Sequence, residues 1–216
     1  MLSQNKSDLE LFFQERSLTT VQQGQFTRYV ELIERWQGKV HLVSKADIYR
    51  LVSKHIRESL WFADRDLISQ QEHVLDLGSG AGFPGIPIKI LYPEIHITLV
   101  ESKRRKALFL QQVCADLNIR KADIFTQRME TLSLSDLASP VDVVVARAVA
   151  GLEILWSWSV PVLAGKGRLM TIKGKEFTEQ VDELQRLFPH TRYHSIPLRD
   201  EEKYLIVVQS RAVESL

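Results

Sequence analysis

The stretch LDLGSGAGFPG, residues 75–85, decides the expected fold of this chain. Four glycines follow one acidic residue, Asp76, at the end of a short apolar run. Glycine adopts backbone dihedrals that other residues avoid, and it lets the backbone approach a ligand closely. A helix that begins near Pro84 would point its first N–H groups at the same ligand. The stretch therefore predicts a strand, a ligand-binding loop and a helix, in that order.

Short β-branched runs alternate with helical patterns around and after this loop. The runs are nearly continuous in apolar residues, which is typical of parallel strands buried on both faces of a sheet. They cover residues 73–78, 96–101, 122–127, 141–148 and 167–174. Two further runs, residues 191–198 and 203–210, are separated only by the charged segment 199–202, which predicts an antiparallel hairpin. We therefore expect an α/β domain with a mostly parallel, Rossmann-like sheet over residues 67–216.

The first 66 residues follow a different pattern. Apolar residues recur at three- and four-residue spacing from Phe26 to Val40, and again from Ile48 to Leu60. This period is that of an amphipathic helix. We expect two or three helices here, which form an N-terminal helical extension, residues 1–66, of the α/β domain.

The composition is that of an ordinary globular protein, with 44% hydrophobic and 25% charged residues among 216. A net charge of +1 does not mark the whole chain as a nucleic-acid binder. No run approaches the ~18 apolar residues that span a bilayer, and the N-terminus lacks the pattern of a signal peptide. We expect a soluble cytoplasmic protein without membrane association. The single cysteine, Cys114, lies on an apolar helical stripe and is expected in the core.

The glycine loop is the place where a nucleotide cofactor would bind. Gly80, Gly82 and Gly85 match the dinucleotide-binding fingerprint, although this match alone is weak. Asp76 would repel a pyrophosphate and attract the ammonium of a methionine group, unless it only braces the turn. Glu101 ends the second strand, where it either accepts hydrogen bonds from two ribose hydroxyls or is an ordinary exposed acid. With five parallel strands and a hairpin, the usual sheet of class I methyltransferases, these features favour S-adenosylmethionine over a nicotinamide cofactor.

Six stretches of the sequence together resemble one enzyme family. They are KHIRES from residue 54, VLDLGSGAGFPGIPIKILYP from 74, ITLVESKRRKALFLQ from 97, QRMETL from 127, VVARAVAGL from 144 and LMTIKG from 169. In order and spacing they resemble the bacterial 16S ribosomal RNA guanine-N7 methyltransferase family, once named glucose-inhibited division protein B. The resemblance runs from about Tyr29 to Val208. The chain departs from the family pattern with HLV in place of NLT at 41–43 and HIRES in place of HILDS at 55–59.

The resemblance implies a monomeric cytoplasmic enzyme that transfers a methyl group from S-adenosylmethionine to N7 of one guanosine in 16S rRNA. Its partner would be that RNA or the small ribosomal subunit, and no obligate protein partner is implied. By motif, Gly78 and Phe83 would line the methionine end of the cofactor, with Met129 and Glu130 beside adenine. Arg147 would face both the cofactor and the target base. With the loop residues, the expected cofactor-binding set is Asp76, Gly78, Gly80, Gly82, Phe83, Glu101, Met129, Glu130 and Arg147.

The implied reaction suits the residues of the chain. Guanine N7 already carries an unprotonated lone pair, so it requires no general base, and holding it in line with the methyl group supplies the catalysis. Arg147 is the one candidate catalytic residue, with a role in placement. Because a guanidinium on N7 would block the nucleophile, we expect it to contact O6, an RNA phosphate or the methionine carboxylate. The alternative is a structural salt bridge at the edge of the sheet.

No metal site is expected from the sequence. The closest histidine pair, His190 and His194, would stand ~13 Å apart on an extended strand. That distance is too long for both side chains to bind one ion.

Basic residues are the candidates for RNA binding. The expected set is Lys54, His55, Arg57, Lys103, Arg104 and Lys173. His55 also falls on an apolar stripe and could instead be a satisfied core residue. Lys103 and Arg104 begin a helix after Ser102, an acceptable N-cap, and would contact phosphate or form a solvated helix face. Lys173 ends the fifth strand and is a candidate phosphate or base contact.

Three other functions remain open at this point. One is a methyltransferase of the same fold that acts on a small molecule. Another is a nicotinamide-dependent oxidoreductase, because the fingerprint and Glu101 are shared by both cofactors. The third is a non-catalytic RNA-binding module that retains the cofactor pocket.

Overall fold

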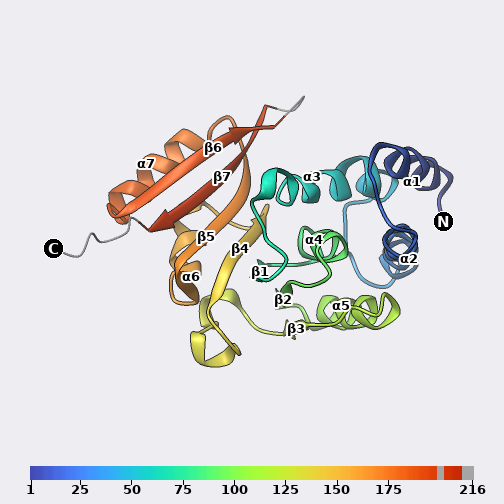
Figure 1. The fold of residues 1–216 in the computed structure, drawn as a ribbon, viewed down its shortest axis with the longest axis horizontal. Coiled ribbons are helices and arrows are strands. Elements are labelled where there is room, and N and C mark those ends of the chain that lie inside the picture. The colour runs from blue at the N-terminus through green and yellow to red at the C-terminus, as the bar shows by residue number, and fades with distance from the viewer. Residues whose placement is uncertain (199–201, 211–216) are drawn as a thin grey trace.

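The chain folds around a seven-stranded sheet in the computed structural model, which describes residues 1–198 and 202–210 (Figure 1). The strand order is β3-β2-β1-β4-β5-β7-β6. The first five positions are parallel, and β7 runs antiparallel to both of its neighbours, β5 and β6. The expected α/β class and C-terminal hairpin are therefore confirmed. Of the predicted hairpin turn, residues 199–201 lie outside the described residues.

The strands begin at the predicted positions, except that β5 begins at Leu163 and not at residue 167. They are β1 (His73–Leu77), β2 (His96–Val100), β3 (Ala122–Phe125), β4 (Val141–Arg147), β5 (Leu163–Gly174), β6 (Thr191–Pro197) and β7 (Lys203–Ser210). Every residue of β1 is buried, as expected for a strand covered on both faces. The glycine loop therefore starts from a rigid central strand.

The α-helices are α1 (Ser3–Glu15), α2 (Thr20–Gln37), α3 (Arg57–Leu60), α4 (Gly85–Leu91), α5 (Arg104–Asp116), α6 (Leu152–Ser159) and α7 (Phe177–Leu187). Before α3 the chain forms a 3-10 turn, η1 (Asp47–Arg50), and a π-helical turn, η2 (Leu51–Ile56). Further 3-10 turns are η3 (Asp64–Asp66), η4 (Met129–Thr131) and η5 (Leu134–Asp136). The predicted N-cap of α5, Ser102, is wrong. Lys103 occupies the cap position, and its N–H donates to Glu101 Oε1 at 2.7 Å.

Helices cover both faces of the sheet (Figure 1). α1 to α5 gather on one side, where Phe26 and Ile33 of the N-terminal helices share a core with Val143 of β4. α6 and α7 cover the other face, and Trp156 packs α6 into that second core. Cys114 packs against the first core, in the place predicted for it, and burial raises the pKa of its thiol to about 11.

The N-terminal helices also contact the glycine loop directly. α2 begins with a capping box between Thr19 and Gln22, and its apolar face carries Tyr29 into the core. The Tyr29 hydroxyl donates to the carbonyl of Ala81 at 2.7 Å, and both the ring and the hydroxyl are buried. One bond from the helical extension therefore satisfies a backbone acceptor of the loop.

Replacing Tyr29 with Phe is expected to lower the free energy of unfolding by about 1–3 kcal/mol, because the Ala81 carbonyl would be left buried without a donor. Urea unfolding of the purified variant measures this change. Tyr49→Phe is the matched control, since Tyr49 is 54% exposed. Equal stability of the two variants would contradict the role given to the Tyr29 hydroxyl.

Candidate functional site

The loop after β1 has a backbone that glycine adopts more readily than any other residue. Gly78, Gly80 and Gly82 have φ angles of +73°, +58° and +97°. A Cβ on Gly82 would lie 2.6 Å from Cγ1 of Ile86 and 2.9 Å from the hydroxyl oxygen of Tyr29. The glycines therefore allow both the turn itself and the close packing beneath it.

Asp76 is buried under this loop. Its side chain is inaccessible to solvent, and its Oδ2 accepts the N–H of Gly85 at 3.0 Å. Burial raises the pKa of its carboxyl to about 7. In this position the carboxyl braces the turn, which is one of the two roles expected for it. Contact with a cofactor ammonium stays a prediction.

Two cavities meet at the carboxyl end of β1. The larger, of about 400 Å³, lies between the glycine loop, residues 42–58 and the end of β4. The smaller, of about 130 Å³, is lined by Glu101, Met129 and Glu130 among others. Gly78 lines both, so the two cavities are neighbours, and together they are called the elongated site. It lies where the strand order reverses between β1 and β4, the usual place for a ligand in such a sheet.

Glu101 lies between the glycine loop and α5. Its Oε2 accepts the N–H of Gly80 at 3.0 Å, and its Oε1 accepts the N–H of Lys103. The residue is 7% exposed, so it is not the ordinary exposed acid that was the alternative. Each carboxylate oxygen has a second lone pair, so a ribose contact is compatible with these bonds and stays a prediction.

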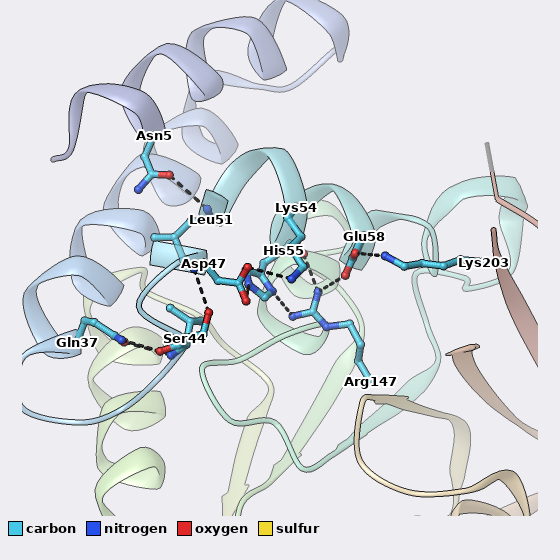
Figure 2. Close-up of polar contacts among 11 residues, drawn as sticks. Asn5, Gln37, Ser44, Asp47, Leu51, Lys54, His55, Glu58, Arg147 and Lys203 are labelled. Carbon is cyan, nitrogen blue, oxygen red and sulfur yellow. Dashed lines mark hydrogen bonds and ion pairs between the residues drawn. The ribbon is translucent and has the colours of Figure 1, made fainter. Parts of the chain in front are cut away.

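Arg147 ends β4 and enters a buried polar cluster (Figure 2). Its Nη1 donates to Glu58 Oε2 at 3.1 Å and to the backbone oxygen of His55 at 3.3 Å. Its Nη2 donates to His55 Nδ1 at 2.7 Å, and the guanidinium lies 5.1 Å from the centre of the Phe83 ring. Arg147 therefore lines the larger cavity, as expected, and also forms the salt bridge that was the alternative.

His55 is held between Arg147 and Phe83. Its ring stacks on that of Phe83, with centroids 5.1 Å apart. Because Arg147 always donates, Nδ1 accepts and the neutral ring carries its hydrogen on Nε2, which lies 3.6 Å from Asp47 Oδ2. Burial and the charge of Arg147 lower the pKa of His55 to about 4. The ring lines the larger cavity from a π-helical turn, a geometry that is frequent at functional sites.

Besides His55, three of the predicted RNA-binding residues have partners within the protein. Lys54 pairs with Asp47 at 2.9 Å, and Arg57 pairs with Glu15 at 2.6 Å. Lys173 donates to the carbonyl of Ala150 at 2.5 Å, and burial lowers the pKa of its ammonium. These contacts fix each side chain to the protein, so RNA contact by any of the three stays a prediction.

Lys103 and Arg104, in contrast, lie on an exposed basic surface. They line a cavity of about 380 Å³. Its other lining residues are the basic residues Lys39, His41, Arg105 and Lys106, and the apolar residue Val40. We call the six basic residues the basic groove. Lys106 also lines the larger cavity, so the groove adjoins the site. Lys39 and His41 were not predicted as site residues, because they come from a distant segment that only the fold brings beside α5.

Sequence reasoning also missed Asp47 and Glu58. Both line the larger cavity and pair with its cations. Glu58 falls inside the quoted stretch KHIRES, and Asp47 is the only acidic residue between Arg35 and Arg57. Those two facts were the available signals. Within the described residues, no group of three or more His, Cys, Asp or Glu is placed to hold a metal ion.

Replacing Gly82 with Ala is expected to cost about 1–2 kcal/mol from the positive φ and about 1–3 kcal/mol from the contact with Ile86. Urea unfolding measures the sum. Gly38→Ala is the control, since Gly38 has a φ of −69° and nothing within 4 Å of the added Cβ. The control is expected to stabilise the protein by ~0.4–1 kcal/mol. Similar effects at the two sites would contradict this account.

Replacing Asp76 with Asn is expected to change how stability depends on pH. The pKa of Asp76 is raised in the folded protein. The stability that this carboxyl contributes is therefore fully present below its usual pKa of 3.8 and is lost as the pH rises through about 7. Asn does not titrate, so the variant does not lose this stability as the pH rises. Its stability relative to wild type should therefore increase by on the order of 2 kcal/mol between pH 5 and pH 7.5. Urea unfolding at several pH values tests this, and a difference independent of pH would contradict it.

The chain is similar to known proteins over most of its length. A family model described as rRNA small subunit methyltransferase G matches residues 22–215. The ribosomal RNA small subunit methyltransferase G of Chloroflexus aggregans is 36% identical over 78% of this chain and 71% of that protein. The protein of the same name from Streptococcus pneumoniae is 31% identical over 92% of this chain and 87% of its own length.

Solved structures share the fold at low sequence identity. A ribosomal protein L11 methylase from Lactobacillus delbrueckii has a TM-score of 0.58 at 14% identity, covering 73% of this chain and 79% of its own. A precorrin-6y C5,15-methyltransferase from Geobacter metallireducens has a TM-score of 0.54 at 14% identity, covering 79% and 91%. These likenesses agree with the class I methyltransferase sheet. The family match over residues 22–215 and the curated relatives at 31% and 36% identity place this chain in the rRNA small subunit methyltransferase G family.

Proposed function

We propose that this protein transfers a methyl group from S-adenosylmethionine to N7 of a guanosine in 16S rRNA. The observation that carries the proposal is the family match over residues 22–215, a range that contains the glycine loop, Arg147 and the whole basic groove. The relatives in that match bear the name ribosomal RNA small subunit methyltransferase G. No feature of the described site favours a nicotinamide cofactor or a small-molecule substrate over this reaction.

The elongated site fits the proposed cofactor. Its larger cavity has a volume within the ordinary range for small-molecule sites. A Cβ on Gly78, which lines both cavities, would lie 2.9 Å from Val149, so a larger residue here would have to displace that side chain. Gly78 and Phe83 would hold the methionine end, while Gly80 and Gly82 shape the loop. Glu101, Met129 and Glu130 would hold the adenosine end in the smaller cavity.

The residues around the larger cavity are suited to placement and not to proton transfer. The bound cofactor supplies an electrophilic methyl group on a sulfonium. Guanine N7 needs no base, and His55 offers none, because its Nδ1 is occupied by Arg147 and its pKa is about 4. A neutral His55 also adds no positive charge where the methylated base becomes cationic. Arg147 would contact O6, an RNA phosphate or the methionine carboxylate.

The basic groove is the proposed surface for RNA. Lys103, Arg104 and Arg105 are exposed at the start of α5, and none of them forms an ion pair within the described part of the chain. Cations at a helix N-terminus oppose the helix dipole, by ~0.3–1 kcal/mol each. RNA phosphates would offset this cost. Because Lys106 joins the groove to the larger cavity, a strand bound in the groove could place a base at the site.

The setting of the proposed reaction follows from its substrate. Ribosomal RNA is found in the cytoplasm of bacteria, so we propose a cytoplasmic enzyme that acts as a monomer on the RNA or on the small subunit. No helix among the described residues has the length and apolar content needed to cross a membrane.

Methyl transfer is tested with labelled S-adenosylmethionine and small-subunit RNA from cells that lack the gene. We expect label in the RNA, and mass mapping should find one new 7-methylguanosine. RNA from wild-type cells, already modified, is the control and should accept no label. Label on another base or atom, or none on either RNA, would refute the proposal.

Replacing Lys103 and Arg104 together with Gln should weaken RNA binding and flatten its salt dependence. For each phosphate that the variant no longer neutralises, the slope of log K against log salt is expected to fall by about 0.7–0.9. Binding titrations at several salt concentrations measure the slope. Lys175→Gln with Arg186→Gln is the control, since those cations pair with Glu202 and Glu183 on the exposed surface. An equal slope in both double variants would remove the groove from the interface.

A further inference from the structure

Glu58 is a buried carboxylate that contacts two cations from distant parts of the chain. It lies in α3 and is 6% exposed. Its Oε2 accepts from Arg147 at 3.1 Å, and its Oε1 accepts from Lys203, at the start of β7, at 2.6 Å (Figure 2). Glu58 therefore links α3 with the ends of two strands at the wall of the larger cavity.

The guanidinium of Arg147 is held by one short segment. Of its five N–H donors, three bond to acceptors on residues 55–58, namely Glu58 Oε2, the His55 oxygen and His55 Nδ1. The other two donors have no partner among residues 1–198 and 202–210. The same side chain lines the larger cavity beside Gly78 and Gly80. Arg147 is thus restrained by the protein and still has donors to offer.

A second ion pair between arginine and glutamate, which is partly buried, shows a different arrangement. Arg168 bonds to both carboxylate oxygens of Glu72 at 2.9 Å, and it also bonds to the backbone oxygen of Leu67. That pair uses the bidentate geometry typical of strong arginine–carboxylate pairs. Glu58 instead gives one oxygen to Arg147 and the other to Lys203. Glu58 therefore restrains the guanidinium of Arg147 through one hydrogen bond and does not take up two of its N–H donors.

The negative charge of Glu58 is needed as the counter-charge of Arg147. A buried guanidinium without a counter-charge is strongly unfavourable, so Arg147 would turn away from its present position. In addition, Arg147 without the charge of Glu58 would add to the positive charge beside a base that becomes cationic on methylation. A neutral side chain at position 58 would therefore disturb both the position of Arg147 and the field at the site.

We infer that Glu58 is a positioning residue for methyl transfer: it holds Arg147 so that two guanidinium donors remain available to an acceptor on the cofactor or the RNA. Lys203 in turn holds Glu58. The inference rests on the proposed function, because it concerns the step in which Arg147 takes part. Glu58 itself contacts neither reactant and acts through Arg147.

The test compares Glu58→Gln, which keeps the shape of the side chain and removes its charge, with Glu58→Asp, which keeps the charge on a shorter side chain. The single-turnover rate at saturating cofactor and RNA is expected to fall ~10²-fold in Glu58→Gln, a decrease typical of a misplaced reacting group. Glu58→Asp should lie between it and wild type. A rate equal to wild type in both variants would overturn the inference.

Glu72→Gln is the control for removal of a carboxylate from a partly buried ion pair with arginine. The side chains of Glu72 and Arg168 are 19% and 17% exposed, against 8% and 13% for Glu58 and Arg147, and neither lines the two cavities of the site. The control should lose stability in urea unfolding and keep the wild-type rate. An equal decrease of rate in Glu72→Gln and Glu58→Gln would show a general structural effect and overturn the inference. If Glu58→Gln does not fold, the single-turnover rate of Glu58→Asp is compared with that of Glu72→Gln. A wild-type rate in Glu58→Asp would then overturn the inference.

A double-mutant cycle shows whether Glu58 acts through Arg147. Glu58→Gln combined with Arg147→Gln should be no slower than Arg147→Gln alone. Additive decreases would overturn the inference. Titration with S-adenosylhomocysteine then shows which group accepts from Arg147. Weaker affinity in both single variants would assign the acceptor to the methionine carboxylate. Unchanged affinity with a higher half-saturating RNA concentration would assign it to the RNA.

Failure of this inference can be told from failure of the proposed function. If wild-type protein transfers no methyl group to RNA, the proposed function fails. If wild type is active and Arg147→Gln is slow, but the two Glu58 variants keep the wild-type rate, only the positioning role of Glu58 fails.

Discussion

The buried carboxyl group of Asp76 accepts the N–H of Gly85, and this bond ties the end of β1 to the start of α4 across the glycine loop. Within the loop, the N–H groups of Gly82 and Phe83 donate to the Ser79 carbonyl, and other polar backbone atoms of the loop bond to side chains outside it. Tyr29 donates to the Ala81 carbonyl, and Glu101 accepts the N–H of Gly80. Because buried backbone groups must be satisfied, these bonds determine the shape of the loop and of both cavities.

Lys106 lines both the larger cavity and the basic groove, and charged side chains are arranged differently in these two places. In the larger cavity the cations Lys54 and Arg147 are paired with Asp47 and Glu58. In the basic groove, Lys103 and its exposed neighbours have no such ion pairs among the described residues. Under the proposed function, the paired side positions the reacting groups, where free charge would oppose the cationic product. The unpaired side binds the phosphate backbone, where free charge is useful.

Much of the fold could be predicted because its signals are local. Apolar runs marked every strand, and the glycine loop marked the site at the end of β1. The roles of the basic residues could not be judged in the same way. Lys54 and Arg57 are close to the sheet in sequence, yet Asp47 and Glu15 hold them. Lys103, and not Ser102, is at the N-cap of α5, and its N–H donates to Glu101. The partner of Arg57 comes from α1, and a local pattern does not reveal such a contact.

The sequence by itself determined the α/β class, the loop with its positive φ angles and Arg147 at the end of β4. These follow from side-chain period and from the conformational freedom of glycine, which act between near neighbours. Only the tertiary structure decided that β7 inserts between β5 and β6, that Lys39 lies beside α5, and that Glu58 joins Arg147 to Lys203. Such contacts join segments far apart in the chain, and packing of the whole core selects them.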